Sequence, residues 1–202
     1  MIRNRWLPAL LLALMLVTPG LAVAPPAQAQ QEPRPATSPE ASIFNLLPPD
    51  ATTRHVAQTA KGPLPYTATA GTLDLYGQDG ALSAAVFYTA YVADNVADKG
   101  AADRPLAFVF NGGPGAASAY LHLGLMGPRR LDFGQAGRLA TTPALRDNPE
   151  SWLDFTDLVF IDPVGTGWSR AASEDKAGRY YGVKADAEAI AKVISLYVQR
   201  NN

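Results

Sequence analysis

The sequence has no cysteine among its 202 residues. That absence excludes disulfide bonds, thiolate catalysis and cysteine-based metal sites. The sequence also has no excess of either charge, because 17 Lys and Arg residues face 18 Asp and Glu residues and the formal net charge is -1. Such a balance lacks the basic patch that binds nucleic acid or an anionic membrane. With 48% hydrophobic and 17% charged residues, the composition is typical of a globular domain.

A hydrophobic run long enough to span a membrane is also missing at the N-terminus. Residues 7–17 are apolar, but Pro19-Gly20 interrupts the run, whereas a spanning helix needs about 20 apolar residues. Arg3 and Arg5 precede the run, and Ala27-Gln28-Ala29 has the small-x-small pattern that signal peptidase accepts. We therefore predict a signal peptide over residues 1–29, a secreted or periplasmic protein, and no membrane attachment after cleavage. A second candidate site, Ala22-Val23-Ala24, is disfavoured because proline follows it.

The mature chain divides by composition into two parts. Residues 30–64 are predicted to form a Pro- and Ala-rich tether and N-terminal extension. Residues 65–202 are predicted to form the folded domain. Its first part has the pattern of a β-hairpin, in which residues 72–76 and 81–92 flank the turn Gln78-Asp79-Gly80.

The rest of the domain alternates buried strands and helices. Strands are predicted over residues 105–110 and 158–161, and each runs into a loop rich in glycine and proline. Helices are predicted over residues 116–126 and 183–200. The second helix has an apolar stripe at helical spacing, formed by Val183, Ala187, Ile190, Ile194, Tyr197 and Val198. This order predicts an α/β fold, a mostly parallel sheet with crossover helices.

The loop Asn111-Gly112-Gly113-Pro114-Gly115 carries the strongest chemical signal. Glycines allow the backbone to approach a ligand closely, and free backbone N–H groups beside a strand end can hold the oxyanion that forms when a hydrolase attacks a carbonyl. Other glycine loops fit less well, because the P-loop needs Gly-Lys-Ser/Thr and the dinucleotide fingerprint needs G-x-G-x-x-G. The loop therefore favours a hydrolase.

The nucleophile that should accompany this loop is absent. An α/β-hydrolase carries it in a G-x-S-x-G elbow, with the histidine base later in the chain. The sequence has no such pattern; its nearest approach is Gly167-Trp168-Ser169-Arg170-Ala171, and both histidines, His55 and His122, precede it. We therefore interpret Ser169 as a structural or pocket-wall residue and His122 as a hydrogen-bonded packing residue. Asp154, Asp157 and Asp162 are interpreted as helix- and loop-capping residues.

Five blocks in order make the sequence similar to the serine carboxypeptidase family of α/β-hydrolases, particularly its exported bacterial members. The resemblance covers roughly residues 65–200. The blocks are Asn111-Gly112-Gly113-Pro114-Gly115, Gly127-Pro128, Asn148-Pro149 with Ser151-Trp152, Asp157-Leu158-Val159-Phe160-Ile161-Asp162, and Pro163-Val164-Gly165-Thr166-Gly167-Trp168-Ser169.

The resemblance implies an α/β-hydrolase fold and cleavage of the C-terminal residue of a peptide substrate through an acyl-enzyme. It implies that the backbone N–H of Gly113 binds the oxyanion and that Asn111, with Gly112 beside it, binds the terminal carboxylate of the substrate. No metal or cofactor is implied. The Ser-Asp-His triad of the family would lie beyond Asn202, so we expect this chain to be the N-terminal portion of a longer enzyme and inactive alone.

Two departures from the family pattern concern substrate binding. Val109 stands where the family often has tryptophan, and Leu125 stands where well-studied relatives have a glutamate that helps to bind the carboxylate. These departures keep open an esterase or acyltransferase of the same fold. The absence of the catalytic triad from this sequence keeps open a second alternative, an inactive binding module.

Overall fold

The computed structural model describes residues 44, 47–94, 104–111, 115–134 and 142–201. All of them belong to one compact unit, Pro39–Asn202. The predicted signal peptide and residues 30–43, 45 and 46 of the predicted tether and extension lie outside the described residues. Among the helices in the described part of the chain, none is both long and apolar enough to cross a membrane.

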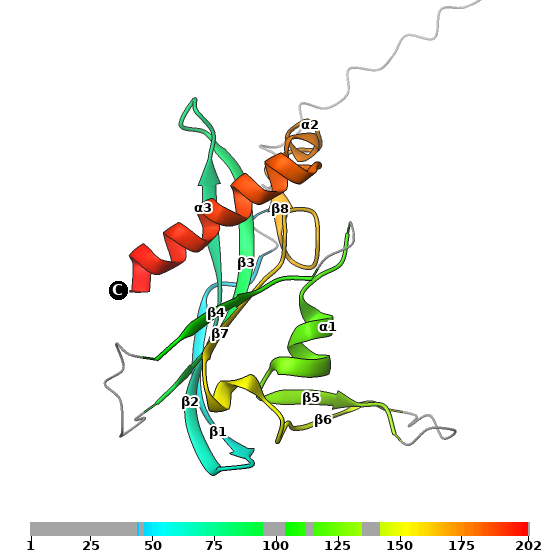
Figure 1. The fold of residues 1–202 in the computed structure, drawn as a ribbon. Coiled ribbons are helices and arrows are strands. Elements are labelled where there is room, and N and C mark those ends of the chain that lie inside the picture. The colour runs from blue at the N-terminus through cyan, green and yellow to red at the C-terminus, as the bar shows by residue number, and fades with distance from the viewer. Residues whose placement is uncertain (1–43, 45–46, 95–103, 112–114, 135–141, 202) are drawn as a thin grey trace, which may run out of the picture. The chain divides into compact units, whose positions relative to one another are not determined.

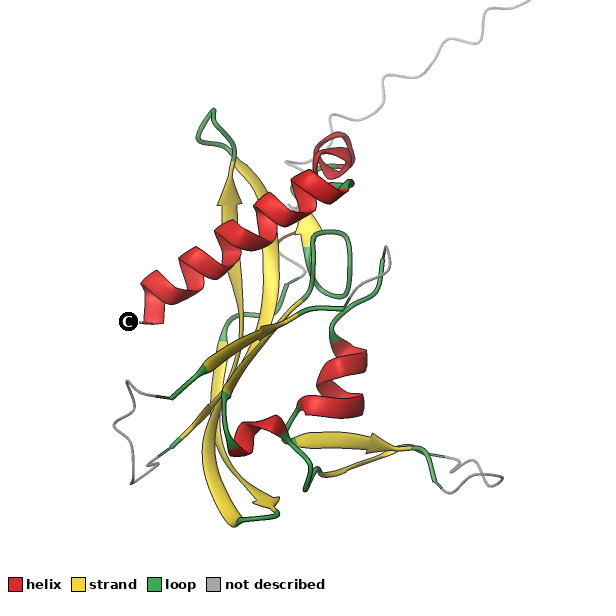
Figure 2. Cartoon of the chain, in the orientation of Figure 1, coloured by secondary structure: helices red, strands yellow, loops and turns green. Residues whose placement is uncertain are grey.

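A six-stranded sheet forms the centre of this unit (Figures 1 and 2). Its strand order is β1-β2-β3-β7-β4, and the short strand β8 also pairs with β3. The strands are β1 (Ala51–Thr59), β2 (Gly62–Tyr76), β3 (Leu82–Ala93), β4 (Leu106–Val109), β7 (Asp157–Ile161) and β8 (Arg170–Ala171).

The predicted α/β class is confirmed, but the described sheet is mixed rather than mostly parallel. The pair β4–β7 is parallel, whereas β1–β2, β2–β3 and β3–β7 are antiparallel. The pairs β1–β2 and β2–β3 are joined by short turns, which force neighbouring strands to run in opposite directions, whereas parallel neighbours need a long crossover. The predicted hairpin is confirmed as β2–β3, where Asp79 Oδ1 accepts the Ala81 N–H in the turn. Strand β1, inside the predicted extension, was not predicted.

The remaining elements are short, except for the last helix. Strands β5 (Arg129–Asp132) and β6 (Ala144–Asp147) form a separate two-stranded sheet that was not predicted. The helix predicted over residues 116–126 is shorter than expected and consists of α1 (Ala119–Leu121) and a π-helical segment, η3 (His122–Met126). The other helical elements are η4 (Trp152–Asp154), α2 (Glu174–Ala177), η5 (Gly178–Tyr180) and α3 (Val183–Asn201).

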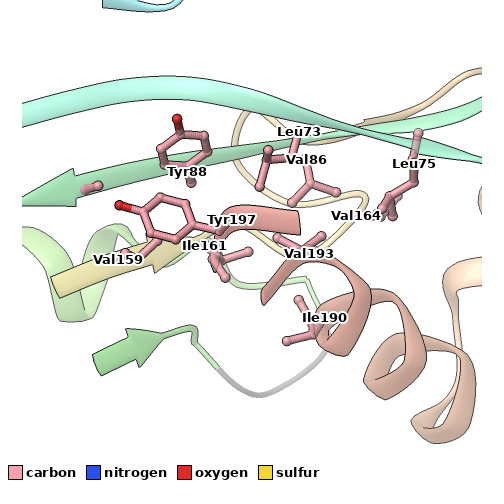
Figure 3. Close-up of a cluster of buried hydrophobic side chains, with 12 residues drawn as sticks. Leu73, Leu75, Val86, Tyr88, Val159, Ile161, Val164, Ile190, Val193 and Tyr197 are labelled. Carbon is pink, nitrogen blue, oxygen red and sulfur yellow. The ribbon is translucent and has the colours of Figure 1, made fainter. Parts of the chain in front are cut away.

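Helix α3 packs on one face of the sheet, where it crosses β2 and β3 (Figure 1). Ile190, Val193 and Tyr197 point toward side chains of the strands, among them Val86 and Ile161 (Figure 3). The helix was predicted correctly, but its buried stripe was partly wrong. Val183 and Ala187 are exposed, and the fully buried Val193 was missed.

The opposite face of the sheet carries α1 and η3. Strand β7 alternates strictly, so that Val159 and Ile161 join the cluster beneath α3, while Leu158 and Phe160 join the cluster on the other face. Leu121 and Met126 pack against that second cluster. Both faces of β7 are therefore covered, which explains why residues 158–161, the strand predicted from the sequence, are apolar without interruption.

Candidate functional site

The two parallel strands end at the same edge of the sheet, and their loops border a pocket. Strand β4 leads to Asn111 and β7 leads to Asp162-Pro163. The pocket has a volume of about 680 Å³, which is the size of a small-molecule or peptide side-chain site. It is lined by Asn111, Gly115, Ala116, Pro163, Val164, Gly165, Thr166, Tyr180, Tyr181, Gly182, Val183 and Asp186. The carboxyl ends of parallel strands are where ligands bind in α/β folds.

Of the residues predicted to bind substrate, Asn111 lies in the pocket wall. Gly112, which was predicted to bind substrate beside Asn111, and Gly113, which was predicted to bind the oxyanion, lie outside the described residues. Gly115 and Ala116, which follow them, line the same pocket. The segment that carries the predicted site therefore borders the pocket at both of its described ends.

Ser169 is a structural residue, as predicted. Its side chain is completely buried. The hydroxyl donates to the main-chain oxygen of Asp162 (2.6 Å) and accepts from the N–H of Phe87 (2.8 Å). A hydroxyl engaged on both sides and shielded from the pocket cannot serve as a nucleophile.

Two of the three aspartates near β7, Asp157 and Asp162, cap main-chain N–H groups as predicted. Asp162 accepts hydrogen bonds from the N–H groups of Ser118 (2.9 Å) and Trp168 (3.1 Å). Asp157, at the start of the strand, accepts from the N–H of Ala93 (3.0 Å) and forms an ion pair with Arg104 (2.7 Å). Asp154 lies in η4. Neither buried carboxylate is bonded to histidine.

His122 is a packing residue, again as predicted. Its ring stacks on Phe160 with centroids 4.6 Å apart, and its Nε2 is 2.5 Å from the hydroxyl of Tyr91. Burial lowers the pKa of His122 to about 4, against a smaller opposing effect of the Asp162 charge. The imidazole is therefore neutral in the folded protein across the physiological range.

This depressed pKa predicts a pH-dependent stability. In the unfolded chain His122 binds a proton below its ordinary pKa of 6.5. In the folded protein it binds that proton only when the pH approaches 4. The contribution of the buried, neutral His122 to the free energy of unfolding is therefore complete above pH 6.5. It is lost as the pH falls toward 4, which lowers the free energy of unfolding by an amount on the order of 3 kcal/mol. Urea unfolding between pH 4 and 8 measures it. His122→Gln should flatten this part of the curve. Equal curves for the wild type and His122→Gln would contradict the assignment.

Two of the sequence blocks meet at the end of η3. The Asn148 side chain is buried and donates to the main-chain oxygens of Leu125 (2.8 Å) and Gly127 (2.9 Å). Ser151 Oγ donates to the oxygen of Met126 (2.9 Å) and accepts from the N–H of Leu153 in η4 (3.2 Å). The Asn148 and Ser151 blocks therefore fasten the Gly127-Pro128 turn. Leu125 itself is 54% exposed.

Sequence reasoning missed one wall of the pocket. Residues 180–183 and Asp186 line it, and they were interpreted only as the approach to a packing helix. Val183, which was predicted to belong to the apolar stripe, is instead 93% exposed and lines the pocket. In the described part of the chain, no group of three His, Asp or Glu side chains could hold a metal ion.

Comparison with known proteins decides the family. A model of the serine carboxypeptidase family (Peptidase_S10) matches residues 61–202, which is more than half of the chain. The chain belongs to the serine carboxypeptidase family. The match begins in the turn between β1 and β2 and includes the loops that border the pocket.

Relatives in this family match over short segments. The pheromone-processing carboxypeptidase kex1 of Sclerotinia sclerotiorum is 43% identical over 65 residues, which are 32% of this chain and 9% of that protein. Serine carboxypeptidase-like 44 of Arabidopsis thaliana is 38% identical over 74 residues, which are 36% of this chain and 14% of that protein. Among solved structures, KEX1(delta)p of Saccharomyces cerevisiae, a prohormone-processing carboxypeptidase, matches with a TM-score of 0.39 and 31% identity over 50% of this chain and 20% of that one. The chain thus spans a small part of these carboxypeptidases.

Proposed function

We propose that this chain contributes the substrate-binding part of a serine-type carboxypeptidase, which removes the C-terminal residue of a peptide through an acyl-enzyme. The observation that carries the proposal is the 680 Å³ pocket with Asn111 in its wall, in a chain that belongs to the serine carboxypeptidase family. The pocket lies where the parallel strands β4 and β7 end, the usual ligand site of such sheets.

Each proposed role follows from a chemical property of the residue. The neutral amide of Asn111 donates a hydrogen bond to the substrate's terminal carboxylate without titrating. The backbone N–H of Gly113, with Gly112 beside it, stabilises the oxyanion that develops as the carbonyl is attacked. The reaction further needs a serine nucleophile and a histidine base, which we propose lie in polypeptide that follows Asn202.

The topology supports a further strand next to the pocket. The connection from β4 to β7 runs through α1 on one face of the sheet, and α3 follows β7 on the opposite face. Crossovers between parallel strands are right-handed, so two crossovers on opposite faces step in opposite directions along the sheet. A parallel strand following α3 would then lie beside β4, which pairs only with β7 within the described residues. Its carboxyl end would lie beside Asn111, where a nucleophile is needed.

Export is part of the proposal. The basic residues, apolar run and Ala27-Gln28-Ala29 site at the N-terminus support a cleaved leader. We propose that the mature enzyme acts outside the cytoplasm, either secreted or periplasmic.

A serine-directed phosphonate probe tests the catalytic part of the proposal. We expect residues 30–202 alone to remain unlabelled, because the one buried serine with a suggestive sequence, Ser169, is already hydrogen-bonded on both sides. The gene product read past codon 202 should be labelled at a serine beyond Asn202. Labelling at Ser169 in the short chain would overturn the assignment.

The substrate is tested with matched peptides that differ only at the C-terminus. A carboxypeptidase cleaves the peptide with a free C-terminal carboxylate but not the amidated peptide. An esterase or acyltransferase cleaves neither peptide and turns over an ester. The exposed Leu125, at the position where relatives have an acid, favours this second candidate. If the phosphonate probe labels the protein and only esters are turned over, the esterase or acyltransferase replaces the carboxypeptidase. If the probe does not label the protein but peptide binds, the protein is a binding module.

A further inference from the structure

The carboxylate of Asp162 sits at the junction of the two loops that border the pocket. The residue is 6% exposed and directly follows β7. Its Oδ1 accepts from both the N–H and the hydroxyl of Ser118 (2.9 Å each), and its Oδ2 accepts from the N–H of Trp168 (3.1 Å). Three donors therefore compensate one buried negative charge, and within the described residues no cation pairs with it.

The partners of Asp162 come from opposite sides of the pocket. Ser118 ends the segment that begins at Asn111, and that segment contributes Gly115 and Ala116 to the pocket wall. Trp168 belongs to the loop that contributes residues 163–166. Asp162 is thus bonded to both walls, although its own side chain is not among the residues that line the pocket.

Gly167 lies directly against the carboxylate of Asp162. Gly167 adopts φ +48°, and a Cβ there would lie 1.8 Å from Asp162 Oδ2 and 3.1 Å from the Cβ of Ala117. A side chain at position 167 would therefore meet both the carboxylate and Ala117 of the other loop. The main-chain oxygen of Asp162 also accepts the buried hydroxyl of Ser169, which closes the second loop onto the end of β7.

We propose that Asp162 is a positioning residue that holds the two walls of the pocket at a set separation and thereby positions Asn111, Gly115 and Ala116 relative to the substrate. The inference rests on the proposed function, because it takes the pocket as the substrate site. It goes beyond a capping role, since the same carboxylate binds both loops. A displacement of about 1 Å in a catalytic site can lower a rate by about a hundredfold.

Asp162→Asn tests the proposal with almost no change of shape. An asparagine has one acceptor oxygen, so its NH2 group must face either the Ser118 or the Trp168 N–H, and one wall loses its bond. In the gene product extended beyond codon 202, we expect kcat per folded molecule to fall about tenfold to hundredfold. Ser118→Ala removes only the hydroxyl bond and should have a much smaller effect. Hydrogen exchange of the Ser118 and Trp168 amides should show faster exchange in Asp162→Asn for at least one of them.

Asp157→Asn is the matched control. Asp157 lies at the other end of β7, is 9% exposed, and is also bonded to a main-chain N–H, but it lies at the opposite end of the strand from the pocket loops. It should lower stability and leave kcat per folded molecule unchanged. Equal kcat for wild type and Asp162→Asn, or equal losses in both variants, would overturn the inference. If the extended wild type turns over no substrate, the proposed function fails. The inference is then tested by hydrogen exchange alone, and equal exchange of the Ser118 and Trp168 amides in wild type and Asp162→Asn would overturn it.

Discussion

Arg104→Met is expected to lower the free energy of unfolding by about 3–5 kcal/mol, because it leaves the buried carboxylate of Asp157 without its counter-charge. Both side chains of the pair are nearly buried, with 10% and 13% of their surface exposed. Arg104 also donates to the main-chain oxygen of Leu153, so the substitution leaves two acceptors short of a donor. The pair joins the entrance of β4 to the start of β7, which is the parallel pair that carries the pocket loops.

Arg146→Met provides a control with the same contact distance. The Nε of Arg146 lies 2.7 Å from Asp132, and the Nε of Arg104 lies 2.7 Å from Asp157, but the side chain of Arg146 is 65% exposed. Water screens such a surface pair, and its loss changes stability very little. Urea unfolding of the three proteins at pH 7 measures the difference. Similar midpoints for the two variants would show that burial does not set the strength of the Arg104–Asp157 pair.

Gly127→Ala is expected to destabilise the protein by about 3 kcal/mol, near the upper end of the usual cost of overpacking. A Cβ at position 127 would lie 2.3 Å from the main-chain oxygen of His122, the same oxygen that accepts the Gly127 N–H at 3.1 Å. The clash is with backbone, so no side-chain rotation relieves it. The turn cannot move away freely, because its oxygen accepts from Asn148.

Gly124→Ala is the matched substitution three residues earlier. Position 124 is exposed in η3, and a Cβ there meets no atom within 4 Å. Alanine is favoured over glycine inside a helix by up to about 1 kcal/mol, so this variant should be as stable as the wild type or slightly more so. Thermal unfolding of both variants decides the point. A Gly127→Ala protein with the wild-type midpoint would show that the turn is not rigid.

The elements that were predicted correctly are those with a local signal. The hairpin turn has its Asp79-Gly80 chemistry, β7 is an unbroken apolar run, and α3 has helical periodicity. The missed elements lack such a signal: β1 is exposed over most of its length, and β5 and β6 pair across residues 135–141, which separate them by more than a short turn. Such strands are recognisable only through the partners with which they pair.

The candidate site divides in the same way. Asn111 was predicted to bind substrate from the family resemblance, and it does line the pocket. The wall formed by residues 180–183 was missed, because no periodicity reveals that the turn before α3 folds toward the loops after β4 and β7. The Asn148 and Ser151 blocks were recognised as family features, but their task of holding the Gly127 turn is visible only in the hydrogen bonds.

The amino-acid order alone determined the family, the hairpin, the two buried strands and the structural nature of Ser169, because each depends on neighbours within a few residues or on the order of short blocks. Tertiary structure decided the mixed sheet, the face on which each helix packs, and the placing of Asp162 between two loops. Those features depend on contacts between residues far apart in the chain. Ser118 and Asp162, for example, are 44 positions apart, and only the parallel alignment of β4 and β7 brings them within hydrogen-bonding distance.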